Sequence, residues 1–230
     1  SERARMTGLE EALAEHGLIP RGGFSFGDGE TAPFGPSGNP ARSVMLVGHG
    51  GGTIWPHFRA WLKTTAEPPA DPLDAWSRAV IGGIAKRFSA RAVFPFDKPW
   101  LPFQQWAMRA EGLRPSPLGI LMHPRFGLWH AYRGALLFDA GNETFSAANP
   151  IHLCDLCAGK DCMNSCPANA VGEAGFDVRA CADRLLSESG EPCRTAGCLA
   201  RAACPHDAYR YGDEQAGFHM AARMRGLEGA

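Results

Sequence analysis

Residues 154–167 read CDLCAGKDCMNSCP, and this cysteine-rich stretch decides what the second part of the chain can be. All eight cysteines of the 230 residues lie between Cys154 and Cys204, and the first 153 residues contain none. Residues 151–213 are short of aliphatic side chains, so a bound group has to supply much of their core. Reduced thiols packed this densely predict metal binding rather than a disulfide framework.

The spacing of the thiols favours two iron–sulfur clusters. The first run is C-x2-C-x4-C-x3-C-P, and the second run also ends in Cys-Pro, at Cys204 and Pro205. Two-cluster ferredoxins carry a similar run, in which the cysteine before the proline ligates the other cluster. Applied here, this rule uses all eight thiols in two sets of four. The first predicted [4Fe–4S] site is Cys154, Cys157, Cys162 and Cys204, and the second is Cys166, Cys181, Cys193 and Cys198.

The cysteine runs are longer than the ferredoxin pattern, and two other uses of the thiols stay open. Gly159 and Gly197 are expected to absorb the extra residues as turns. Zinc in four-cysteine sites is one alternative, although both Cys-Pro endings would then be coincidental. One cluster plus zinc or free thiols is the other. The plant-type [2Fe–2S] spacing would need a cysteine where Ser165 stands.

The chain is expected to have an α+β or α/β fold. In its cysteine-free part predicted strands alternate with predicted helices, which favours an α/β sandwich. A loop or hairpin is expected at 18–42, and a turn at 124–127 between the last two strands. Helices are expected at 4–17, 54–65, 74–88, 103–111 and 215–227. Strands are expected at 43–48, 90–95, 119–123 and 133–139. The predicted domains are a cofactor- or partner-binding domain at 1–150 and an iron–sulfur domain with a closing helix at 151–230.

Composition and charge narrow the classes of function. The net charge is −1, so no basic excess indicates nucleic acid as a partner. No apolar run approaches the about 20 residues that span a bilayer, and the N-terminal stretch lacks the apolar core of a signal peptide. We therefore expect a cytoplasmic protein without membrane contact that exchanges electrons with a redox partner protein.

In its cysteine runs and in the segment before them, the chain resembles the C-terminal half of epoxyqueuosine reductase and the reductive dehalogenases. Those enzymes place one isolated cysteine between two clustered groups, and Cys181, after DVRA, fits that position. WAMRAEGL at 106–113 and SPLGILMHP at 116–124 resemble the segment before their corrinoid-facing strands. RFGLWHAYRGALLF at 125–138 resembles the strand that leads into their ferredoxin domain.

The resemblance implies a nitroreductase-like α/β sandwich that holds cobalamin base-off, followed by a small ferredoxin-like domain with two clusters that reduces it. It implies an oxidoreductase with a corrinoid or small-molecule substrate, but it assigns no catalytic acid to this chain. Two alternatives remain open: a stand-alone ferredoxin-type electron carrier for a partner enzyme, and a binding module in which the clusters are structural.

Residues outside the cysteine runs supply candidates for other roles. HGGG at 49–52 follows a predicted strand, where glycine lets a backbone approach a cofactor or phosphate; a tight strand-to-helix turn is the alternative. Neither a Walker lysine nor a GxGxxG pattern accompanies it. The cofactor-binding candidates are His49, Gly50, Gly51 and His123. The catalytic candidates are His130 and Tyr132, whose hydroxyl would donate a proton unless it only packs.

Overall fold

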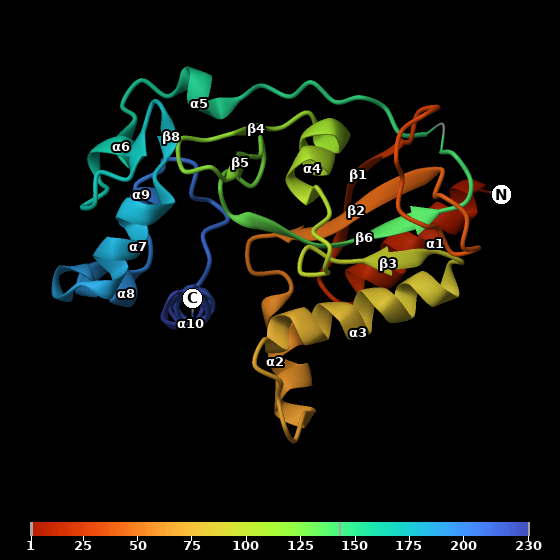
Figure 1. The fold of residues 1–230 in the computed structure, drawn as a ribbon, viewed down its shortest axis with the longest axis horizontal. Coiled ribbons are helices and arrows are strands. Elements are labelled where there is room, and N and C mark those ends of the chain that lie inside the picture. The colour runs from red at the N-terminus through yellow and green to blue at the C-terminus, as the bar shows by residue number, and fades with distance from the viewer. Residues whose placement is uncertain (1, 143, 230) are drawn as a thin grey trace. The chain divides into compact units, whose positions relative to one another are not determined.

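The computed structural model describes residues 2–142 and 144–229, and it divides the chain into two compact units (Figure 1). Unit 1 consists of Ser1–Gly112 and Ala131–Pro150, and unit 2 of Leu113–His130 and Ile151–Ala230. Helices and strands occur in both units, so the fold is mixed α+β, as expected. The units differ from the predicted domains at residues 113–130, which pack with the cysteine-rich segment.

A four-stranded sheet in the order β1-β2-β6-β3 forms the centre of unit 1. β1 pairs antiparallel with β2, and β3 pairs antiparallel with β6. Every residue of β2 is buried, as expected of an apolar run at the middle of a sheet. The strands are β1 (Ile19–Ser25), β2 (Ser43–Gly50), β3 (Arg91–Val93) and β6 (His130–Phe138).

Four helices pack on this sheet and on one another. α1 contacts β1 and α3, while α4 contacts β1 and β2. α4 ends at Gly112, whose φ of 67° is left-handed; a Cβ there would lie 2.0 Å from the carbonyl oxygen of Ala148, so glycine is required. The helices are α1 (Glu2–Ala14), α2 (Trp55–Thr64), α3 (Pro72–Arg87) and α4 (Phe103–Glu111).

Unit 2 is built from short elements around a small core. Its strands are β4 (Arg114–Pro115), β5 (Leu121–Met122), β7 (Val171–Gly172) and β8 (Gly175–Phe176). Its helices are α5 (Leu153–Leu156), α6 (Asp161–Asn164), α7 (Val178–Leu186), the 3-10 helix η1 (Glu188–Gly190), α8 (Glu191–Ala196), α9 (Leu199–Ala202) and α10 (Asp213–Glu228). Its buried core consists of Leu118, Met122, Leu128, Val171, Ala200 and Cys204. With so little apolar surface to bury, a bound group would add substantially to the stability of this unit.

The strands predicted at 119–123 and 133–139 do not pair with each other. β5 pairs with β4 in a separate two-stranded sheet, because β6 already has β2 and β3 as its neighbours. Among the residues that the structure describes, no helix is long and apolar enough to cross a bilayer.

Candidate metal centre

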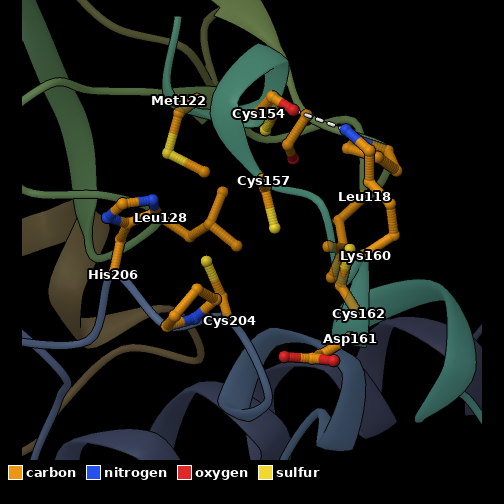
Figure 2. A pocket seen from close by; sticks show the side chains of 13 residues that line it. Leu118, Met122, Leu128, Cys154, Cys157, Lys160, Asp161, Cys162, Cys204 and His206 are labelled. Carbon is orange, nitrogen blue, oxygen red and sulfur yellow. Dashed lines mark hydrogen bonds between the residues drawn. The ribbon is translucent and has the colours of Figure 1, made fainter.

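Four thiols of unit 2 line one cavity, which is partly open to solvent (Figure 2). Cys154 belongs to α5, Cys157 follows that helix, and Cys162 belongs to α6. Cys204, far along the chain, is the fourth and is the most buried of the eight. Figure 2 shows the side chains of Cys157 and Cys204 pointing into the cavity. These are the four residues that the spacing assigned to one cluster.

The other four thiols form a second group. The thiol of Cys181, on α7, interacts electrostatically with those of Cys166, Cys193 and Cys198. The thiol of Cys193, on α8, interacts with those of Cys166 and Cys198 as well. Cys198 is exposed, whereas the other three are half-buried. The fold therefore brings the eight thiols into two groups of four with the membership expected from the sequence, while their role as ligands stays a prediction.

Residues with a positive φ lie within both cysteine runs. Lys160, with φ of 48°, precedes α6, and its ammonium donates to the carbonyl of Cys154. Gly197, with φ of 81°, separates Cys193 from Cys198. Gly159 lies in a bend next to Lys160, and Gly197 has a positive φ between α8 and α9. That the two glycines absorb the extra residues stays a prediction.

Apolar side chains from residues 113–130 form one wall of the first thiol cavity. Leu118, Met122 and Leu128 are all buried there, and Cys154 and Cys162 pack against the same core. Thiolates around a cavity with a dry wall match the way proteins hold iron–sulfur clusters, whose potentials depend on solvent exposure. The residues present therefore fit such a group.

A single metal ion requires its ligand atoms to lie closer together than a four-iron cluster does. Within residues 2–142 and 144–229, no three His, Cys, Asp or Glu side chains lie close enough together to hold one ion. A tetrahedral zinc ion needs sulfur atoms about 3.8 Å apart, as follows from Zn–S bonds of about 2.3 Å. A four-iron cluster is bound at its corners and holds its cysteines farther apart.

Burial controls the acidity of the thiols in both groups. The pKa of Cys154 is raised to about 11, mainly by burial and secondly by the neighbouring thiol of Cys204. Burial also raises the pKa values of four other thiols, Cys162, Cys181, Cys193 and Cys204. These cysteines are therefore protonated at neutral pH, and metal binding has to release their protons.

Arginines accompany the second group of thiols. Arg184 and Arg194 act on Cys193, and Arg223 acts on Cys181; each favours the thiolate. Arg194 also donates to the carbonyls of Leu185 and Ser187, so it joins α8 to the end of α7. Positive charges at these positions would offset the negative charge of a cluster with four thiolates.

Two of the other candidates lie in a buried polar network of unit 1. Arg21 donates to both carboxylate oxygens of Glu111, at 2.8 and 2.9 Å, to the hydroxyl of Tyr132 and to the carbonyl of His49. The hydroxyl of Tyr132 in turn donates to Glu111. Burial is the main cause that raises the pKa of Tyr132, so its hydroxyl stays protonated. Sequence inspection missed Arg21 and Glu111, since no local pattern links residues so far apart.

The HGGG stretch makes the strand-to-helix turn that was the alternative to a cofactor site. The ring of His49 is buried, and its Nδ1 donates to the carbonyl of Gly51 at 2.9 Å. Gly50 ends β2, and Gly51 has a left-handed φ of 58°. A role of these residues in cofactor binding stays a prediction.

The remaining candidates, His123 and His130, lie together in unit 2 with ring centres 5.6 Å apart. Nδ1 of His123 accepts from the backbone N–H groups of Arg125 and Phe126, which closes the turn after β5. Nε2 of His130 donates to the carbonyl of Leu121 at 2.7 Å. Both imidazoles thus hold backbone in place, and a catalytic or cofactor-binding role for either stays a prediction.

Comparison with known proteins shows where this fold occurs. No family model matches the chain, and no curated protein matches it in sequence. The crystal structure of CblC from C. elegans, described as a B12-trafficking protein, is similar with a TM-score of 0.56 and 14% identity. That match covers 98% of this chain and 96% of CblC.

Epoxyqueuosine reductase from Streptococcus thermophilus is the second similar structure, with a TM-score of 0.53 and 11% identity. The match covers 90% of this chain and 66% of the reductase. The chain shares its fold with both proteins. The resemblance noted in the sequence is thereby confirmed for the fold.

Proposed function

We propose that this chain is an iron–sulfur redox protein that holds two [4Fe–4S] clusters and passes electrons to a corrinoid. The observation that carries the proposal is the grouping of the eight thiols. One set of four lines a single cavity and the other four interact with one another, in the interleaved membership of a two-cluster ferredoxin. Bound clusters would supply one-electron transfer steps.

The residues around the thiols would have distinct tasks in such a protein. Leu118, Met122 and Leu128 would keep water from the first cluster. Arg184, Arg194 and Arg223 would stabilise the reduced, more negative state of the second. Since Cys198 is exposed, the second cluster is the one that we assign to electron entry from a redox partner protein.

Anaerobic purification is expected to yield a brown protein with about eight iron and about eight sulfide per chain. Low-temperature EPR of the dithionite-reduced protein should detect reduced clusters. A colourless protein with zinc bound by all eight thiols would contradict the proposal. About four iron with free thiols would mean that one site binds no cluster.

The corrinoid part of the proposal rests on the fold shared with CblC, which is described as a B12-trafficking protein, and on the motifs at 106–138. Added cobalamin is expected to bind base-off, because the resembled reductases hold it in that form. A titration followed by visible spectroscopy and calorimetry tests this. Reducible clusters without cobalamin binding would instead identify an electron carrier for a partner enzyme.

A further inference from the structure

A second cavity of unit 2 lies beside Cys198 and differs in character from the first. It has a volume of about 200 Å³ and is partly open to solvent. Residues from three segments line it: Trp129 precedes β6, Arg201 belongs to α9, and Arg223 belongs to α10. The function proposed above uses Arg223 but not the cavity.

Flat aromatic and guanidinium groups form the buried side of this cavity. Trp129 and Tyr211 meet edge to face with ring centres 5.4 Å apart, and both are buried. The guanidinium of Arg201 lies over both rings, 4.3 Å from the centre of Trp129 and 5.0 Å from that of Tyr211. Because Arg201 lies over both rings and is itself only half-buried, its flat guanidinium is the group that a planar ring in the cavity would meet.

Two donors at this surface are buried without an acceptor among the described residues: Nε1 of Trp129 and Nε of Arg201. Trp129 is 5% exposed, so its indole N–H is not exposed to bulk solvent. Neither group can accept a hydrogen bond, so each is an unpaired donor beneath the surface of the cavity.

The charges that line the cavity are mostly positive. Three arginines, Arg201, Arg210 and Arg223, line the cavity with one carboxylate, that of Asp213. The other titratable groups in the lining are Cys198, Tyr211 and His219. Arg210 also lies over Trp129, at 5.8 Å from the ring centre. Guanidinium groups bind phosphate and carboxylate oxygens through paired hydrogen bonds, so the cavity suits an anion.

We propose that this cavity binds a planar organic anion, a ring compound that carries a phosphate or carboxylate group. The guanidinium of Arg201, held over the two aromatic rings, takes the ligand ring. Arg210 and Arg223, which are both exposed, take the anionic group. A ligand there would lie against Cys198. Cys198 and Arg223 also belong to the surroundings of the proposed second cluster, so a ligand at this position would suit an electron donor to it.

Calorimetry on the anaerobically purified full chain tests the proposal with two probe pairs. FMN and riboflavin share a ring but differ in the phosphate, as do 1-naphthyl phosphate and 1-naphthol. Each anion is expected to bind at least about tenfold more tightly than its neutral counterpart, since hydrogen bonds to charged groups contribute about 1.5–3 kcal/mol. Equal affinities, or no binding of either anion, would overturn the proposal.

Substitution of the two exposed arginines of the cavity tests whether the anions bind there. Arg210→Gln and Arg223→Gln are each expected to weaken binding of both anions about tenfold or more. Arg225→Gln is the matched control, because Arg225 is exposed on the same helix but does not line the cavity. Equal affinity in all three variants would exclude this cavity as the site. A protein that binds the anions but contains no iron would support this inference and overturn the proposed clusters. A protein with two clusters that binds neither anion would support the clusters and overturn this inference.

Discussion

Cys204→Ala is expected to remove the same cluster as Cys157→Ala, although the two residues belong to different cysteine runs. Both thiols line the first cavity, together with Cys154 and Cys162, so either change takes one corner from the same ligand set. Iron should fall from about eight to about four per chain, because the other ligand set is untouched. Both variants should then give the same EPR spectrum after reduction, that of the second cluster.

Cys198→Ala provides the matched control, since Cys198 lies in the same run as Cys204 but in the other thiol group. It should also lose about four iron and leave the spectrum of the first cluster. Cys166→Ala, from the first run, should give that same spectrum. If Cys204→Ala resembles Cys198→Ala instead, the ligands follow the order of the chain and the interleaved assignment is wrong.

Glu111→Gln is expected to lower the free energy of unfolding of unit 1 by about 3–5 kcal/mol, because it leaves a buried guanidinium without its counter-charge. The side chain of Arg21 is 1% exposed, and it donates to both oxygens of Glu111. Urea unfolding followed by tryptophan fluorescence measures this. Five of the six tryptophans report on unit 1: Trp55, Trp61, Trp76, Trp100 and Trp106.

Glu30→Gln is the matched control for this experiment. Glu30 pairs with Arg109 through the same kind of ion pair, but the two side chains are 41% and 44% exposed. Solvent screens such an exposed pair, so its loss should lower the free energy of unfolding far less than loss of the buried pair. Equal losses in Glu111→Gln and Glu30→Gln would show that the buried pair contributes no more than an exposed one.

Features governed by local rules were predictable from the sequence. The grouping of the thiols follows from their spacing and from the proline after Cys166 and Cys204. β2 follows from a continuous apolar run, and the end of α4 follows from Gly112. In each case neighbouring residues contain the whole signal.

Features that depend on contacts between distant residues were not predictable. Arg21 and Glu111 are 90 positions apart, and Arg21 lies in an irregularity of the β1–β2 pairing within a segment expected to be a loop or hairpin. The membership of residues 113–130 in unit 2 was missed because their strand-like pattern does not identify the partner strand. Nothing in the local sequence relates Trp129 to Arg201, whose guanidinium lies 4.3 Å from the centre of the indole ring.

The chain passes between its two units three times, after residues 112, 130 and 150. A fragment that starts at Ile151 would therefore contain every cysteine but lack the apolar wall of the first thiol cavity. During synthesis, Leu118, Met122 and Leu128 leave the ribosome well before Cys204, the residue that completes this core. Their apolar surface stays exposed until Cys204 emerges, so insertion of the proposed first cluster would be a late step, and a shortage of iron would favour aggregation.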